Sequence, residues 1–325
     1  MKRLFGYLAL FALLAAAPLL LNRFCADSRY WVDVLNSVGL YLVLALSLNI
    51  ILGYAGMFNM GHAVFYAIGA YTTAILNTRF GMPVLATLPL AGCTAAVFAL
   101  MTARPIIHLR GDYLLIVTIG MVEIVRIALM NDVFGLTGGA NGIFGIERIR
   151  CFGFRLTKPV HYFYLIWAFA GLTVLLFSLL ENSRFGRALR YLNADEVAAA
   201  GSGIDVAHYR LAAFVLGAGW AGMCGTLFAA KMTIISPQSF NYWESVVLFM
   251  IVILGGSGSI PGVILGAFLV TGLPELFRSF DNARQLVFGL ALMIMMIVRP
   301  QGLLPPKTRR YQAAAPLTAL AEKTP

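Results

Sequence analysis

Two side chains of opposite charge, Glu123 and Arg126, lie one helical turn apart within an apolar run of the sequence. A single charge at the centre of a bilayer costs about 2.5 to 3.5 kcal/mol on insertion scales, so this spacing predicts a pair that neutralises itself on a face turned inward. The same two groups could instead bind the amino and carboxylate groups of a zwitterionic substrate. The sequence leaves both interpretations open.

The rest of the chain offers no set of residues that predicts covalent chemistry. It has no Ser/His/Asp group, no paired carboxylates in a plausible active site and no GxxxxGK[ST] phosphate loop. Its four cysteines have no metal or redox spacing, and His62, beside a glycine bend, is interpreted as a packing residue rather than a proton relay. We therefore predict no enzyme activity, no metal site and no cofactor bound by this chain.

The composition is that of a protein whose solvent is mostly lipid. Of its 325 residues, 60% are hydrophobic and 12% are charged, and the mean hydropathy is +0.83. A soluble domain could not cover this much apolar surface with polar groups. The net charge of +10 does not predict nucleic-acid binding, because the 24 Lys and Arg residues are spread thinly and form no dense patch among aromatic residues.

Apolar stretches near the ~20 residues needed to cross a bilayer occur about ten times, which predicts an all-α, polytopic membrane domain over residues 1–304. We interpret the first stretch as an uncleaved span rather than a signal peptide, because its apolar run continues to Leu21. The approximate limits of the ten spans are 4–21, 31–52, 61–78, 83–107, 113–130, 160–180, 211–231, 243–254, 260–277 and 284–298.

An even number of spans puts both ends of the chain on one side of the membrane. The basic residues near the two ends assign that side to the cytoplasm; they are Lys2, Arg3, Lys307, Arg309 and Arg310.

The same parity predicts an outer loop over residues 131–159, and residues 305–325, rich in Ala, Pro and Lys, read as a disordered cytoplasmic tail. Cys25 and Cys151 share the outer face in this topology, and whether they form a disulfide is left open.

The segment over residues 183–210 is the longest charge-rich interruption of the apolar sequence, and the parity places it inside. Its first part predicts a short amphipathic helix, because apolar residues fall between basic ones at helical spacing. The basic face consists of Arg184, Arg187 and Arg190. Such a helix could dock on a protein partner or rest on anionic lipid.

A second helix is expected directly after the basic one. Asn193 is its expected N-cap, with Glu196 closing a capping box three residues later. Gly201 and Gly203 are expected to supply the left-handed positions that end it.

Glycines gather at two further places inside the apolar sequence. The first group is Gly53, Gly56 and Gly61 near Asn59, and the second is Gly255 and Gly256. Such glycines either let helices pack closely or break a helix so that its backbone lines a cavity, and the sequence does not decide between these roles. Under the second role these residues, together with Glu123 and Arg126, are candidates for a translocation pathway.

Several segments resemble one family, the ABC importer permeases for branched-chain amino acids. The 183–210 segment is similar to the family's cytoplasmic coupling loop, although Ala200–Gly201–Ser202 departs from the usual Glu-Ala-Leu and predicts a shorter, less acidic helix. The resemblance extends from about residue 40 to 304. Its other motifs are GYAGMFNMGHAVFYAIGAY, LRGDY, TGGANG, SPQSF, LGGSGS, LPE and RPQGLLP.

The resemblance implies a ten-span importer fold and a transport subunit in a bacterial inner membrane. The implied substrates are leucine, isoleucine and valine; other amino acids, short amides and urea are compatible alternatives. The implied partners are a second, homologous permease, two ATPase subunits that bind the ATP, and an external substrate-binding protein, besides lipid. In the coupling loop, the residues implied to act on the ATPases are Arg187, Asn193, Glu196 and Gly203.

Two further hypotheses remain open. An ion-coupled secondary transporter would need a carboxylate at mid-membrane, for which Glu123 is the clear candidate. The five-residue similarity between Gly53–Met57 and Gly219–Met223, on spans expected to run in opposite directions, suggests an inverted repeat.

Overall fold

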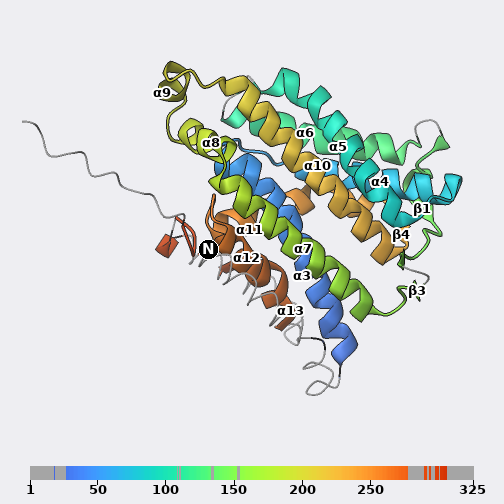
Figure 1. Ribbon diagram of the computed structural model, residues 1–325. Helices are drawn as coiled ribbons and strands as arrows, with labels where there is room; N and C mark the ends of the chain where they lie inside the picture. The colour runs from blue at the N-terminus through green and yellow to red at the C-terminus, as the bar shows by residue number, and fades with distance from the viewer. Residues whose placement is uncertain are drawn as a thin grey trace, which may run out of the picture.

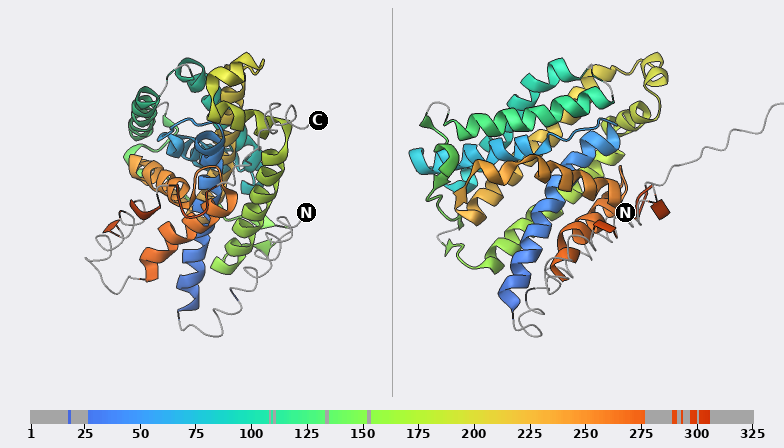
Figure 2. Two further views of the ribbon diagram at one scale, coloured as in Figure 1. Left: turned by 90° about the vertical axis from the view of Figure 1, so that its left-hand side faces the viewer. Right: turned by 180° about the vertical axis from the view of Figure 1, so that it is seen from behind.

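The computed structural model is a bundle of long helices with α3 in its interior (Figures 1 and 2). It describes residues 18, 27–107, 109, 111–132, 135–151, 154–276, 289–290, 293, 297–299 and 301–305. The α-helices are α3 (Ser28–Asn49), α4 (His62–Phe80), α5 (Val84–Ile106), α6 (Asp112–Met130), α7 (Pro159–Asn182), α8 (Arg184–Ala194), α9 (Glu196–Gly201), α10 (Val206–Met232), α11 (Tyr242–Gly255), α12 (Ile260–Ala267) and α13 (Leu273–Leu276). The short elements are the π-helices η1 (Ile50–Tyr54) and η5 (Phe268–Gly272), the 3-10 helices η3 (Gly139–Asn141) and η4 (Pro237–Phe240), and the strands β1 (Ile143–Phe144), β2 (Arg150–Cys151), β3 (Phe154–Arg155) and β4 (Ile234–Ile235).

The helices confirm that the chain is a mostly helical, multi-pass membrane protein. Among the described residues, five helices are long and apolar enough to cross a bilayer, and two shorter apolar helices are Tyr242–Gly255 and Ile260–Glu275. The five are Ser28–Tyr54, Val84–Ile106, Asp112–Met130, Pro159–Asn182 and Val206–Met232. All of the expected first span except residue 18, most of the tenth and nearly all of the tail lie outside the described residues, so the count of ten stays a prediction.

Small residues bring α4, α5 and α10 into close contact. A methyl group added at Gly225 on α10 would lie 2.6 Å from the Ala70 nitrogen on α4. Four alanines of α5 recur every fourth residue and are buried; they are Ala91, Ala95, Ala99 and Ala103. In lipid, helices associate through such close backbone packing rather than through the hydrophobic effect. The three helices therefore form a tight unit beside α3.

The outer loop is a chain of tight turns held against the helix ends. Gly135, Gly138, Gly139, Gly142 and Gly145 all have positive φ angles, as glycine allows without steric cost. Within the loop, β2 pairs antiparallel with β3, while β1 pairs antiparallel with β4, which follows α10. The all-α prediction therefore needs a small correction, because these two-residue pairs are too short for a sequence signal.

An aspartate organises the start of this loop. The Asp132 carboxylate accepts hydrogen bonds from the backbone nitrogens of Thr137 at 2.8 Å and of Gly138 at 2.9 Å. The bond from Thr137 is the main reason that the pKa of Asp132 lies below its usual range, since a donated hydrogen bond favours the charged form.

Candidate functional site

The centre of the candidate site is a break between α3 and α4. At the end of α3 the hydrogen-bond pattern widens, because the Ala55 nitrogen donates to the Ile50 oxygen at 3.1 Å and the Met57 nitrogen donates to the Ile51 oxygen at 3.0 Å. An α-helix would instead link each nitrogen to the oxygen four residues earlier. The chain then runs without helix through residues 57–61 before α4 begins at His62.

Side chains of α6, of α11 and of the break itself accept hydrogen bonds from three backbone nitrogens at this junction. The Met60 nitrogen donates to the Thr118 hydroxyl on α6 at 3.2 Å, and the Ala63 nitrogen donates to the Ser245 hydroxyl on α11 at 3.0 Å. The Gly61 nitrogen donates to the Asn59 side-chain oxygen at 2.7 Å. Irregular backbone at membrane depth is tolerated where protein buries it in this way. The break is therefore a built junction of α3, α4, α6 and α11.

His62 is buried at the first position of α4 and bonds back to α3. The Ser47 hydroxyl donates to the Leu44 oxygen at 2.7 Å, and the same oxygen atom lies 2.7 Å from His62 Nε2. The Ser47 hydroxyl therefore links α3 to the first residue of α4. His62 also contacts Phe65 edge to face. This arrangement is the one expected of a packing histidine.

The first group of glycines packs against backbone and side chains. A methyl group at Gly53 would overlap with the Gly258 nitrogen, which donates to the Asn49 side-chain oxygen at 2.8 Å. A methyl group at Gly61 would lie 2.8 Å from the Thr118 oxygen. Neighbouring segments approach these two positions so closely that only glycine fits there.

The second group of glycines packs against α12 and the end of the described chain. A methyl group at Gly255 would overlap with Gly262 on α12, and one at Gly256 would lie 2.8 Å from the Leu304 oxygen. The Leu303 and Leu304 nitrogens donate to the oxygens of Leu254 at 2.9 Å and of Gly255 at 3.0 Å. Gly258, two residues after Gly256, contacts Gly53, so the turn that follows the second group lies against the first. The role of both groups in a pathway stays a prediction.

The 183–210 segment contains the two expected helices, α8 and α9, at one end of the bundle (Figure 1). The predicted N-cap was wrong: Asn193 lies inside α8, and Asp195 caps α9 by accepting bonds from the nitrogens of Val197 at 2.9 Å and Ala198 at 3.0 Å. The expected capping box does not form, because Glu196 pairs with Arg210 instead, with both oxygens 3.1 Å from the guanidinium.

The glycines of this segment differ in conformation. Gly203 has a φ of 83°, which confirms the expected left-handed position after the helix. Gly201 is the last residue of α9 and has no positive φ, so its predicted left-handed role was wrong. A single left-handed residue is enough to end a helix, as in most glycine C-caps.

The basic face of α8 is exposed, and so is an apolar residue of α9. Arg187 bonds to the Asn182 oxygen at 2.8 Å, while α8 buries Leu189 and Leu192 against the bundle. Val197 on α9 is 80% exposed. The segment thus offers an exposed surface that is both basic and apolar on a helix pair anchored from behind.

Asn193 joins this segment to the helix break. Its side-chain nitrogen donates to the Gly53 oxygen at 3.0 Å. A methyl group at Gly56, whose φ is 68°, would overlap with the oxygen of the same side chain. The coupling candidate Asn193 and the pathway candidates Gly53 and Gly56 are therefore direct neighbours.

The ion pair on α6 forms as the sequence predicts. Arg126 Nη2 lies 2.7 Å from the Glu123 carboxylate, and Arg126 Nε donates a hydrogen bond to it at 2.9 Å. The two side chains are 27% and 40% exposed. Both residues are partly buried, and the expected inward direction of the pair stays a prediction.

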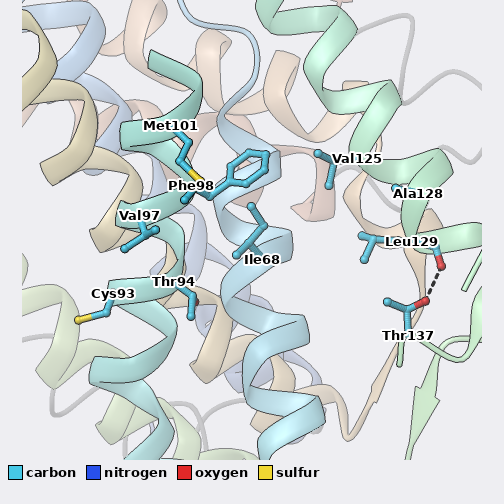
Figure 3. A pocket seen from close by; sticks show the side chains of 10 residues that line it. All are labelled: Ile68, Cys93, Thr94, Val97, Phe98, Met101, Val125, Ala128, Leu129 and Thr137. Atoms are coloured by element: carbon cyan, nitrogen blue, oxygen red, sulfur yellow. Dashed lines mark hydrogen bonds between the residues drawn. The ribbon is translucent and has the colours of Figure 1, made fainter. Parts of the chain in front are cut away.

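An apolar groove of about 560 Å³ lies between α4, α5 and α6, where Ile68, Phe98 and Val125 face one another (Figure 3). The hydroxyl of Thr94 donates to the Ala91 oxygen at 3.0 Å and that of Thr137 to the Leu129 oxygen at 2.8 Å. The polar groups of the groove are thus engaged by backbone, so it suits an apolar occupant and not a zwitterion.

Sequence reasoning did not single out four polar residues that hold this site: Asn49, Thr118, Ser245 and Arg210. The first three are isolated polar residues in apolar spans. This pattern could have identified them in the sequence, since a lone polar group in lipid needs a hydrogen-bond partner. Their partners lie far away in the sequence and could not be assigned from it.

The comparisons with known proteins agree on one family. Residues 30–298 match the family model described as "Branched-chain amino acid transport system / permease component". The chain is 38% identical over 301 residues to the "High-affinity branched-chain amino acid transport system permease protein LivM" of Escherichia coli, covering 86% of this chain and 71% of that protein. It is 28% identical to the permease protein BraD of Pseudomonas aeruginosa, covering 81% of this chain and 91% of that protein. Among solved structures there is no match.

The contact between Gly53 and Gly258 yields a first prediction. We expect Gly53→Ala to lower the free energy of unfolding by about 1 to 3 kcal/mol, because the added methyl group meets backbone that cannot move aside freely. Gly120→Ala on α6 is the matched control, since no atom lies within 4 Å of its added methyl group. The measurement is the fraction of monodisperse protein that remains after heating in detergent. Equal losses for both variants would contradict the packing argument.

Proposed function

Since this chain belongs to the family of branched-chain amino acid transport system permease components, we propose that it is the membrane subunit of an ATP-driven importer of leucine, isoleucine and valine. The observation that carries the proposal is the match to LivM over most of the chain. The broken helix tied to an exposed helix pair supports it, because a subunit driven from outside needs a contact surface connected to its interior.

The proposed assembly contains a second, homologous permease, two ATPase subunits that bind the ATP, and a binding protein on the outer face. LivH of Escherichia coli, named as a permease protein of the same high-affinity system as LivM, is also 27% identical to this chain, which supports pairing between homologous permeases. We place the complex in the bacterial inner membrane with both ends of this chain in the cytoplasm, where the basic residues of its ends belong.

We propose that the 183–210 segment docks on an ATPase subunit rather than resting on lipid. Val197 projects from the far end of the helix pair, and the basic face includes Arg187. The Glu196–Arg210 pair and the left-handed Gly203 fix the shape of the loop between α9 and α10. A loop of defined shape suits a groove on a protein, whereas binding to lipid would need only the basic and apolar faces.

The proposed pathway includes the helix break, with Gly53, Gly56, Asn59 and Gly61, and the facing bend at Gly255 and Gly256. Breaks that expose backbone groups near the middle of the membrane form substrate sites in many transporters. Family membership argues against the alternative of an ion-coupled transporter that uses Glu123, which is already neutralised by Arg126.

Uptake measurements test the proposed function. In a bacterial strain without its own branched-chain uptake, the complete transporter should import radiolabelled leucine, and unlabelled isoleucine and valine should compete. If only urea or short amides compete, these compounds are the substrates, and the chain is still a permease of the same family. If uptake persists with ATPase subunits that cannot hydrolyse ATP, the transporter is not driven by ATP and the proposal is wrong.

The docking proposal yields a prediction with an internal control. Gly203→Val should release the ATPase subunits and abolish uptake, because a β-branched residue is strained at a φ of 83°. Gly201→Ala should retain the ATPase subunits and normal uptake, since Gly201 is helical. The two variants are comparable because no atom lies within 4 Å of a methyl group added at either glycine. Co-purification of the ATPases with the permease measures retention. If Gly203→Val keeps the ATPases and transports normally, the segment rests on lipid.

The ion pair on α6 yields a separate prediction. We propose that Glu123 and Arg126 neutralise each other beside the pathway and do not bind substrate. Either single charge reversal should reduce uptake strongly, because two like charges would then share one turn of the helix. The double variant Glu123→Arg with Arg126→Glu should recover much of the leucine uptake. A double variant that stays inactive or changes its preference for charged ligands would assign the pair to substrate binding.

A further inference from the structure

We propose that Asn193 is a positioning residue that selects between two hydrogen-bond registers at the end of α3, so that movement of the 183–210 segment changes the helix break. The inference rests on the proposed function, in which that segment docks on an ATPase.

The first observation is the exchange of partners at Gly53. In an α-helix the Gly53 oxygen would accept from the Met57 nitrogen. Here the Met57 nitrogen donates to the Ile51 oxygen at 3.0 Å, and the Gly53 oxygen accepts from the Asn193 side chain at 3.0 Å. Asn193 thus occupies the place of a backbone donor.

The competition between these two donors defines two states. If α8 withdraws Asn193, the oxygen of the buried residue Gly53 loses its side-chain donor, and an unpaired carbonyl inside the protein is costly. The nearest backbone remedy is for the Met57 nitrogen to leave Ile51 and bond to Gly53, which rewinds η1 into an α-helix. A π-helical turn within an α-helix is a local register defect, and it is removed by such a shift.

Gly56 has the conformational freedom that this change requires. Its φ of 68° lies in the left-handed region, while the rewound register needs a right-handed residue at the same place. Glycine adopts both conformations at little cost, and the absence of a side chain leaves room for the Asn193 carboxamide. A residue with a side chain would favour the rewound state, because it disfavours the left-handed conformation and because it takes up the space of the Asn193 carboxamide.

The contacts of Gly53 carry the change further into the bundle. Gly53 packs on Gly258, whose nitrogen donates to the Asn49 side chain at 2.8 Å. Gly258 belongs to the turn between α11 and α12 and has a φ of 81°. A shift of the Gly53 backbone must therefore move this turn, because the Gly258 backbone and the Asn49 side-chain oxygen that it bonds both lie directly against Gly53.

The anchoring of α8 makes Asn193 responsive to the 183–210 segment. Leu192, the preceding residue, is 2% exposed, and Ala194 ends the same helix. Asn193 therefore lies within α8 and not on a loop, so a displacement of that helix displaces Asn193. A displacement that breaks a 3.0 Å hydrogen bond is small compared with the length of the helix.

The test uses the complete transporter in lipid discs with three variants of this chain. Asn193→Leu removes the donor at similar size, and Gly56→Ala disfavours the left-handed residue. Asn182→Leu is the control, because the Asn182 amide bonds to the Ser178 oxygen of its own helix at 2.8 Å. The readouts are deuterium exchange of the amides of residues 53–58, ATP hydrolysed per leucine imported, and retention of the ATPase subunits.

In Asn193→Leu and Gly56→Ala we expect slower amide exchange over residues 53–58, because the rewound helix gives each amide a carbonyl four residues back. The ATP hydrolysed per leucine should rise several-fold while the ATPases stay bound. Asn182→Leu should match the unaltered protein. Faster exchange, or an unchanged ATP ratio, in both test variants would show that Asn193 is only a structural pin and would overturn the proposal.

The outcome can be told apart from a failure of the proposed function. If the unaltered transporter imports no branched-chain amino acid, the substrate assignment fails. The exchange of residues 53–58 still reports the register of α3 in that case, because it needs neither substrate nor ATP.

Discussion

The structure depends on one constraint: where a helix is interrupted inside the membrane, the backbone N–H and C=O groups that lose their helical partners need other hydrogen-bond partners. Where α3 gives up its regular pattern, lipid can offer no hydrogen bond in return. Thr118, Ser245 and Asn193 supply the missing partners from α6, α11 and α8. This need places three otherwise separate helices around one short segment, and it explains why Thr118 and Ser245 occur as single polar residues in apolar helices.

Much of the fold follows from the sequence, because length and hydropathy set where helices can cross a bilayer. The limits expected for the spans at 113–130 and 160–180 differ by at most two residues from Asp112–Met130 and Pro159–Asn182. The glycine groups and the two helices of the 183–210 segment were also predicted. These features have local causes, and a single sequence contains them.

The error at the N-cap of α9 comes from a distant partner. Asn193 and Asp195 are both plausible N-caps by local chemistry, and the sequence alone favours Asn193 because Glu196 follows three residues later. The structure uses Asn193 elsewhere, on the Gly53 oxygen, and leaves the cap to Asp195. In the same way, the helical spacing of Glu123 and Arg126 predicts their contact but not the direction in which they face.

The pairing of Leu303 and Leu304 with the end of α11 affects how the chain is made. The last carbonyls of a helix need partners from outside it, and those of Leu254 and Gly255 receive theirs from residues that the ribosome adds about fifty positions later. Until then the α11–α12 hairpin enters the membrane with this end unfinished. The end of α11 is therefore completed only after residues 303 and 304 have been synthesised.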